Sequence, residues 1–318
     1  MCTYNGARFL QEQLESIAAQ TRPPDELVVC DDRSTDETRA VVVSFAAGAP
    51  FTVRLYVNEQ NLGAAKNFER AIGLATGDVI ALSDQDDVWQ AGKLERTEKE
   101  FLSGADVGLV FGDTEVTDES LRPLGYSMLW GNKFTPEDRA KITGGRAFEV
   151  LLNRSIVTGA TMAFRSSFKE LVLPIPNDLG MVHDHWIALL VAARARVSFV
   201  EEPFIKYRQH TRQQVGIGVL RDSVSDKLAA ARQTTAASYL AAARPLDVIL
   251  ERLRERVGDD LSAEVRAQLE AKSGHLRTRA RMPKGRLRRV PLVLKELFAA
   301  HYHQYSDGMN SALRDLLL

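Results

Sequence analysis

Residues 78–89 read Asp-Val-Ile-Ala-Leu-Ser-Asp-Gln-Asp-Asp-Val-Trp, and this stretch decides how the rest of the chain is interpreted. Its apolar run, residues 79–82, suits a strand that is buried on both faces. Three carboxylates follow within four residues: Asp84, Asp86 and Asp87. Carboxylates packed together repel one another, so their ionised state needs a cation. Oxygen ligands select hard cations, and we expect Mg²⁺ or Mn²⁺ here. An acidic turn that merely caps the next helix is the plain alternative.

Strand-like and helix-like segments alternate on both sides of this stretch. The expected strands are apolar runs, and the expected helices carry apolar residues at helical spacing. The expected strands are 26–30, 51–57, 78–82 and 197–200, and the expected helices are 9–19, 38–45, 63–75 and 186–193. Strands separated by helices predict an α/β fold, a three-layer α/β/α sandwich around a mostly parallel sheet. Ligands of such sheets bind at the carboxyl ends of the strands.

The composition is that of an ordinary globular protein. The chain has 318 residues, of which 45% are hydrophobic and 26% charged, which excludes a disordered chain, a collagen and a disulfide miniprotein. The formal net charge of −1 excludes a whole-chain electrostatic nucleic-acid binder. Two cysteines, Cys2 and Cys30, are too few for a disulfide framework and favour a reducing compartment. With no signal peptide and no apolar run of about 18 residues, we expect a cytoplasmic protein.

Polar segments follow the expected strand ends. Their order along the chain resembles that in the nucleotide-sugar-binding half of family 2 glycosyltransferases with the GT-A fold. The segments that carry the resemblance are Thr3-Tyr-Asn-Gly6, Leu27–Asp36, Asn58–Gly63 and Asp84–Trp89. The resemblance covers about residues 2–215. The form Ser-Asp-Gln-Asp-Asp-Val-Trp, with Tyr207-Arg-Gln-His210 downstream, is similar to the rhamnosyltransferase branch.

The resemblance implies a donor site built from these segments. Asp32, together with Asp31, would accept a hydrogen bond from the imide N–H of uracil or thymine. The residues that would border the base or belong to the same segments are Thr3, Tyr4, Asn5 and Gly63. Lys66 would meet the phosphates, although a solvated surface lysine remains an equal alternative. Helix capping remains the alternative for Asp31 and Asp32.

The resemblance also implies the metal site. Asp84 would hold the ribose, and Asp87 would contact the donor sugar or orient its neighbour. Asp86 would be the direct metal ligand, with His210 as a second one. Neutral imidazole is an acceptable ligand for Mn²⁺ and a poorer one for Mg²⁺. A histidine in a surface loop is the alternative for His210.

The acceptor side is expected in the second half of this domain. Gly159, within Thr158-Gly-Ala-Thr161, would let the backbone approach a sugar or diphosphate closely. Asp184, within His183-Asp-His-Trp186, opens a helix and by resemblance serves as general base, with Trp186 beside it. The alternatives are a strand-entry turn for Gly159 and a helix cap for Asp184. Two flanking histidines without a third site do not make a zinc site.

The C-terminal part differs from the preceding residues in amino-acid composition and charge. We place the boundary after residue 218: residues 1–218 form the glycosyltransferase domain and residues 219–318 a helical, basic region. Residues 220–318 carry 18 basic against 12 acidic side chains. Seven cations, Arg277, Arg279, Arg281, Lys284, Arg286, Arg288 and Arg289, precede an apolar segment at 291–298. This segment could pack against the catalytic domain or dock on anionic lipid at the inner face of the cell membrane. RNA binding is the third reading and the one we favour least, so no nucleic-acid partner is expected.

The sequence thus predicts an inverting, metal-dependent glycosyltransferase. We favour dTDP-L-rhamnose as donor and a saccharide or lipid-linked saccharide of a bacterial surface polysaccharide as acceptor. A UDP-hexose donor, or a nucleotide-sugar-binding membrane scaffold without turnover, are the alternatives. The family places an apolar strand directly before the Thr3 segment, where this chain has only Met1 and Cys2. We therefore expect the first strand to be cut short, with the natural protein beginning upstream.

Overall fold

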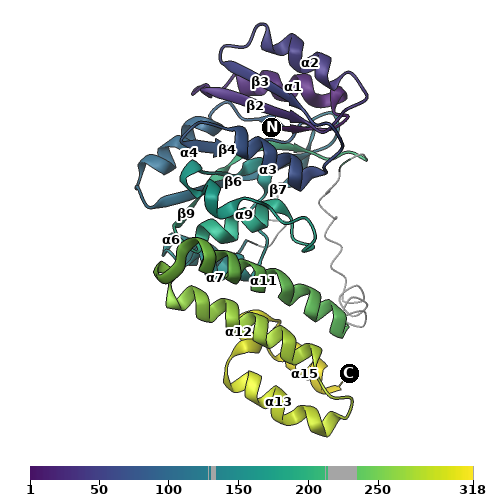
Figure 1. Ribbon diagram of the computed structural model, residues 1–318, viewed down its shortest axis with the longest axis vertical. Helices are drawn as coiled ribbons and strands as arrows, with labels where there is room; N and C mark the ends of the chain where they lie inside the picture. Colours follow the sequence, from purple (N-terminus) through teal and green to yellow (C-terminus); the bar gives the residue numbers. More distant parts are fainter. Residues whose placement is uncertain (128, 130–133, 212, 214–234, 318) are drawn as a thin grey trace. The chain divides into compact units, whose positions relative to one another are not determined.

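The computed structural model describes residues 1–127, 129, 134–211, 213 and 235–317. The chain divides into two compact units: Met1–Asn177 with Val182–Val219, and Asp178–Met181 with Leu220–Leu318. The expected boundary between residues 218 and 219 lies outside the described residues. The first unit is α/β and the second is helical (Figure 1).

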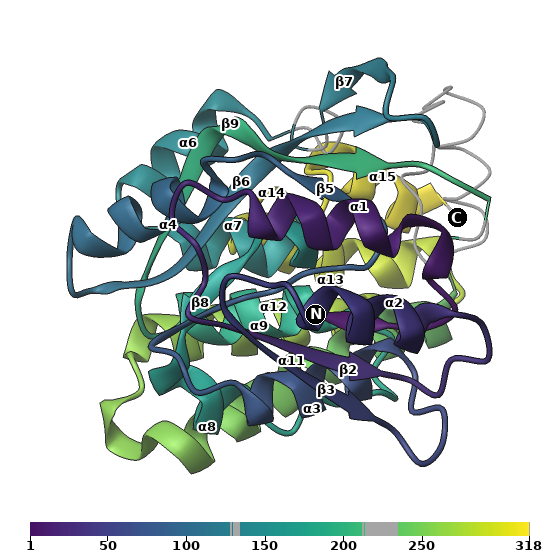
Figure 2. The same cartoon turned by 90° about the horizontal axis from the view of Figure 1, so that it is seen from above.

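The first sheet of unit 1 is wholly parallel and runs in the order β1 (Cys2–Thr3), β2 (Glu26–Asp31), β3 (Thr52–Val57). The middle strand β2 is buried along nearly its whole length, as its apolar run predicts. Helices α1 (Ala7–Ala18) and α2 (Thr38–Ala46) lie on one face of this sheet and α3 (Ala64–Leu74) on the other (Figure 2). This arrangement confirms the expected α/β class.

The second sheet is mixed, in the order β4–β8–β6–β9–β5, and β7 pairs with β6. Its strands are β4 (Val79–Ala81), β5 (Val88–Trp89), β6 (Val107–Thr117), β7 (Pro123–Ser127), β8 (Ala163–Arg165) and β9 (Arg196–Arg208). Only β6 and β9 pair in parallel among the described residues of this sheet. The short turn between β6 and β7 leaves no room for a crossover helix, so these two strands must run antiparallel.

The two sheets meet at the N-terminal strand, where the Cys2 N–H donates to the Ser83 carbonyl at 3.2 Å. This contact brings the carboxyl ends of β1 and β4 together. The other helices of unit 1 are α4 (Lys93–Leu102), α6 (Pro136–Thr143), α7 (Ala147–Asn153), α8 (Lys169–Val172) and α9 (His183–Ala192), with 3₁₀ turns at Gly159–Thr161 and Ser166–Phe168. Leu10, Val29 and Val110 are fully buried members of a shared core.

The described residues of unit 2 form two long helices followed by three shorter ones. They are α11 (Ala236–Val257), α12 (Ala263–Ala280), α13 (Arg286–Phe298), α14 (His301–Tyr305) and α15 (Met309–Leu317), with a 3₁₀ turn at Gly258–Asp260. Thr235 and Ser238 form a capping box at the start of α11, and Gly258, at φ +62°, ends it. Within the described residues, no helix combines the length and apolarity that crossing a membrane requires.

Candidate active site

The loop between β4 and β5 carries the three carboxylates, and it is short of positive charge. Burial, with Asp86 and Asp184 nearby, raises the pKa of Asp84 to about 7. Asp87 is fully buried, and burial together with Asp86 and Asp84 raises its pKa well above the ordinary value. Its Oδ2 atom has no hydrogen-bond partner among the described residues. Such a group resists ionisation until a cation is supplied.

Asp86 and His210 lie next to each other although 124 residues separate them in the chain. The Asp86 Oδ2 and His210 Nε2 atoms are 2.9 Å apart, and their side chains are 17% and 7% exposed. Pairing of β5 with β9 brings the two chain segments together. The Phe9 ring supports the imidazole at a centroid distance of 4.9 Å. The structure thus brings together the two residues that we expected to bind the metal.

The Asp86–His210 pair is an incomplete ligand set. Among the described residues, no third His, Cys, Asp or Glu has a ligand atom within 4.8 Å of both. A cation held here would therefore complete its coordination with phosphate oxygens and water, as Mg²⁺ commonly does.

Two buried cations beneath the loop were missed by sequence reasoning. Arg208 is 2% exposed; its Nε donates to the Asp86 carbonyl at 2.8 Å and its backbone N–H to Asp87 Oδ1 at 3.2 Å. Its guanidinium also pairs with Glu12. Because Arg208 immediately precedes the Gln-His pair of the quoted motif, its position in the strand leading to His210 was the available signal.

Lys93, at the start of α4, is the second of these cations. Its Nζ donates to the Ala160 carbonyl at 2.7 Å and lies 3.5 Å from the Trp89 ring centroid. Burial lowers its pKa to about 7, opposed by Asp87 and Asp84. A lysine in the first turn of a helix is disfavoured by the helix dipole. This unfavourable position was the sequence signal that negative charge lies near Lys93.

Asp184 opens α9 and contacts the turn at Gly159. Its Oδ2 accepts the Gly159 N–H at 3.0 Å, and its Oδ1 accepts the His185 N–H at 2.6 Å. A Cβ at Gly159 would lie 3.2 Å from His183 Nε2, so a side chain there would crowd the site. The His183 ring stacks on Phe68 at 4.4 Å, and burial lowers its pKa. Asp184 is thus oriented by backbone donors.

Trp186 lies deeper than the acceptor role requires. It is 1% exposed, and its indole N–H donates to the Val172 carbonyl at 2.8 Å. The side chain packs inside unit 1, since a bulky apolar residue in the second turn of a buried helix gains most from the core.

We expected Asp31 and Asp32 to contact the nucleotide base. In the structure both carboxylates accept hydrogen bonds from residues of nearby loops. Asp31 accepts from the Thr3 hydroxyl at 2.9 Å and from the Ser34 N–H at 2.8 Å and its hydroxyl. Asp32 accepts from the N–H groups of residues 62 and 63 at 2.7 and 2.9 Å and from the Asn58 amide. A carboxylate has about four acceptor positions, so about one remains on each, but Asp31 is fully buried and Asp32 is nearly so. Gly63, at φ +79°, permits the turn whose backbone N–H groups donate to Asp32.

The Thr3–Gly6 segment is fastened to the acidic loop. The Tyr4 N–H donates to Gln85 Oε1 at 2.8 Å, and Gln85 Nε2 donates to the Tyr4 carbonyl at 3.1 Å. A Cβ at Gly6 would lie 2.1 Å from that Gln85 oxygen, so a side chain there would displace the Gln85 amide. The Tyr4 side chain is 42% exposed. Asn5, at φ +47°, accepts the Thr35 N–H at 2.8 Å.

Lys66, expected to meet the phosphates, forms an ion pair in this structure. Its Nζ lies 2.8 Å from Glu69 Oε2, and both side chains are more than a quarter exposed. Such a pair contributes little to stability. Lys66 therefore remains able to exchange partners.

Comparison with known proteins gives a consistent result. The family model described as "Glycosyl transferase family 2" matches residues 1–171. An uncharacterized glycosyltransferase of Nostoc sp. is 30% identical over 210 residues, 65% of this chain and 62% of that protein. The chain therefore spans about three fifths of that relative. The dTDP-rhamnosyl transferase RfbG of Shigella flexneri is 26% identical over 69% of this chain and 74% of its own.

Among solved structures, TarS 1-349 of S. aureus in complex with UDP-GlcNAc has a TM-score of 0.54. It is 18% identical, and the likeness covers 96% of this chain and 87% of TarS 1-349. At this identity the likeness concerns the fold.

Proposed function

The chain belongs to glycosyl transferase family 2, and we propose that it transfers a sugar from a nucleotide sugar to a saccharide acceptor with a divalent cation as cofactor. The observation that carries the proposal is the cluster at the β4–β5 loop. There Asp86 meets His210, Asp84 and Asp87 have raised pKa values, and one buried carboxylate oxygen has no hydrogen-bond partner in the part of the chain that the structure describes. A site of this kind favours a bound cation over bare carboxylates.

Mg²⁺ or Mn²⁺ fits these residues. Asp86 and His210 would hold the ion, and a carboxylate paired with an imidazole favours Mn²⁺ over Mg²⁺. When bound, the ion supplies positive charge for the diphosphate that leaves. Arg208 holds the loop through Asp86 and Asp87, and both Lys93 and Arg208 are too buried to reach a substrate.

Asp184 would act as the general base. Backbone N–H groups donate to both of its carboxylate oxygens, which fixes the direction of the side chain. It removes the proton of an acceptor hydroxyl while that oxygen bonds to C1 of the sugar and the C1–diphosphate bond breaks. Because attack comes from the face opposite to the leaving group, one displacement inverts the anomeric centre.

The donor that we propose is dTDP-L-rhamnose. A free acceptor position on Asp32 suits the imide N–H that thymine and uracil share, and the similarity to RfbG favours the rhamnosyl donor. The test measures dTDP released from dTDP-L-rhamnose with Mn²⁺, with UDP-glucose compared in parallel. Release that stops when a chelator is added supports the proposal. Binding of both donors without release in any condition would indicate the non-catalytic scaffold.

We further propose that unit 2 docks on an anionic membrane surface through α13. Four apolar side chains at helical spacing form one exposed stripe, namely Leu287, Val290, Leu294 and Phe298, exposed by 88%, 38%, 45% and 88%. The side chains that flank the stripe include Arg286, Arg288 and Lys295, which are exposed. Val293 and Glu296 on the opposite side are buried. An exposed apolar stripe between cations is typical of helices that lie in the lipid interface.

Not every cation of the basic segment can contact lipid. Arg277 pairs with Asp247, Arg279 pairs with Asp315, and Arg289 donates to the carbonyls of Pro283 and Asp315. Those three arginines take part in contacts within unit 2, although the Arg277–Asp247 pair is still about two fifths exposed. The lipid-facing set is therefore narrower than the sequence predicts.

A further inference from the structure

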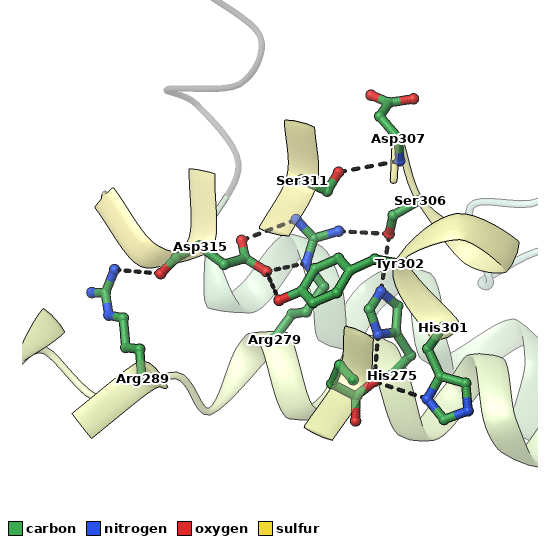
Figure 3. Close-up of polar contacts among 10 residues, drawn as sticks. His275, Arg279, Arg289, His301, Tyr302, Ser306, Asp307, Ser311 and Asp315 are labelled. Carbon is green, nitrogen blue, oxygen red and sulfur yellow. Dashed lines mark hydrogen bonds and ion pairs between the residues drawn. The ribbon is translucent and has the colours of Figure 1, made fainter. Parts of the chain in front are cut away.

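Three helices of unit 2 bring two histidines and a glutamate into direct contact. His275 of α12 and His301 of α14 both turn Nδ1 toward the Oε2 atom of Glu296 in α13, at 2.6 and 2.9 Å (Figure 3). The ligand atoms of all three lie within 4.8 Å of one another. This cluster belongs to unit 2 and is independent of the proposed transferase chemistry.

The cluster is buried on one side and reachable on the other. The His275 side chain is 0% exposed and that of Glu296 is 6% exposed, whereas that of His301 is 25% exposed. An ion could therefore enter past His301 without unfolding the helices. Buried charged groups are normally paired or coordinate metals, and among the described residues the hydrogen-bond partners of this glutamate are the two histidines.

The far side of the His275 ring is also fixed. Its Nε2 lies 3.0 Å from the Ser306 hydroxyl oxygen, and Arg279 Nη1 donates to the same oxygen at 2.8 Å (Figure 3). With its Nδ1–H donated to Glu296, neutral His275 accepts the Ser306 hydroxyl at Nε2, and once a metal takes Nδ1 the ring proton can move to Nε2 and be donated to Ser306. Metal-binding histidines are held in this way, one nitrogen toward the ion and the other donating to a neighbour.

We propose that His275, Glu296 and His301 form a structural zinc site that ties α12, α13 and α14 together. Two imidazoles and one carboxylate are a donor set that zinc accepts readily and that Mg²⁺ and Ca²⁺ do not favour. Zinc bonds of about 2.0–2.2 Å require the present contacts to widen by less than about 1 Å. Water on the His301 side would complete the tetrahedron.

The charges of the three side chains suit this role. Burial lowers the pKa of His275, which keeps its imidazole neutral and able to coordinate. Burial opposes ionisation of Glu296, yet hydrogen bonds from both histidines hold its pKa below the ordinary value. Zinc would replace the two ring protons that now face this carboxylate.

Calorimetric titration of the chelator-treated full chain with ZnCl₂ tests the site. Every chain in this titration, the wild type included, carries Asp86→Ala as background, because the Asp86–His210 pair of unit 1 would otherwise hold zinc in preference to Mg²⁺. His301→Ala removes one ligand, and His303→Ala on the same helix removes an exposed histidine as matched control. We expect one zinc per wild-type chain, the same for His303→Ala, and at least about tenfold weaker binding for His301→Ala.

Thermal unfolding gives a second readout. Zinc should raise the melting temperature of wild type and of His303→Ala but not of His301→Ala, because only a folded site binds it. Glu296→Gln, which keeps the side chain's shape, should behave like His301→Ala. The proposal is overturned if the wild type takes up no zinc, or if His301→Ala binds it as tightly as the control.

Discussion

The acidic loop of unit 1 and the Arg279–Asp315 pair of unit 2 both bury carboxylates, and they treat them in opposite ways. Asp315 receives two hydrogen bonds from Arg279, at 2.7 and 3.0 Å, and one from the Tyr302 hydroxyl at 2.8 Å. In the loop, Asp84 and Asp87 have raised pKa values, and one Asp87 oxygen has no hydrogen-bond partner within the described ranges of the chain.

The difference separates structure from function. A carboxylate that is matched within the protein stabilises the fold and has nothing to offer a ligand. A carboxylate left short of positive charge costs stability and is retained where a ligand or cation completes it. We therefore assign the loop to chemistry and the Arg279–Asp315 pair to the architecture of unit 2.

Asp184→Asn is expected to have the largest effect, which is on the rate of sugar transfer. The substitution keeps the side chain's volume and removes its ability to take a proton. Sugar transfer should fall by about 10²- to 10⁴-fold, the usual contribution of a general base, while donor binding is retained. Transfer near the wild-type rate would exclude Asp184 as base.

Arg279→Met probes the matched carboxylate in unit 2. It leaves Asp315 buried without its cation, which typically costs about 3–5 kcal/mol. Chemical denaturation followed by a probe in unit 2 should show this loss, whereas donor binding by unit 1 should be unchanged. Arg266→Ser, an exposed arginine of α12, is the control. Equal stability of the Arg279 and Arg266 variants would contradict the claim that Arg279 stabilises the fold by pairing with Asp315.

Asp84→Asn should have the opposite sign from Arg279→Met. The pKa of Asp84 is raised from 3.8 to about 7, so the folded state holds its proton more tightly than the unfolded state. Its cost to folding therefore appears as pH rises above about 4 and is complete above about pH 7. In metal-free buffer, Asp84→Asn should melt higher than wild type at pH 8 and much less so at pH 4. An equal difference at both pH values would contradict the raised pKa.

The smallest effect is expected at the membrane surface. Arg286→Ser and Arg288→Ser should each weaken binding to anionic vesicles by about 1 kcal/mol, whereas Arg266→Ser should not. Sedimentation with vesicles that contain anionic lipid measures this. Equal sedimentation of all three variants would reject docking through α13, and stronger retention on RNA than on vesicles would favour the nucleic-acid alternative.

Local patterns were enough to predict the elements that carry the site. The apolar run of β2 and the helical spacing of α1 are properties of neighbouring residues, so the sequence reveals them directly. The strand expected at 197–200 extends in fact over Arg196–Arg208. Its second half passes through Glu201-Glu-Pro203 and is a strand because β6 and β5 pair with it, which no local pattern contains.

The same limit applies to the site. The order of motifs indicated Asp86 and His210, but the buried roles of Arg208 and Lys93 depend on distant partners. Arg208 contacts Glu12, 196 residues away, and Lys93 contacts the Ala160 carbonyl, 67 residues away. A buried cation looks like a surface cation until its partners are placed around it.

The central claim is that Asp86 and His210 hold a cation that nucleotide binding needs. The most direct test is a calorimetric titration of dTDP and UDP into wild type, Asp86→Ala and His210→Ala, each with and without Mn²⁺. We predict that Mn²⁺ strengthens nucleotide binding by the wild type, has no effect on Asp86→Ala, and has a reduced effect on His210→Ala. Nucleotide binding by Asp86→Ala that Mn²⁺ strengthens as much as in the wild type would contradict the account.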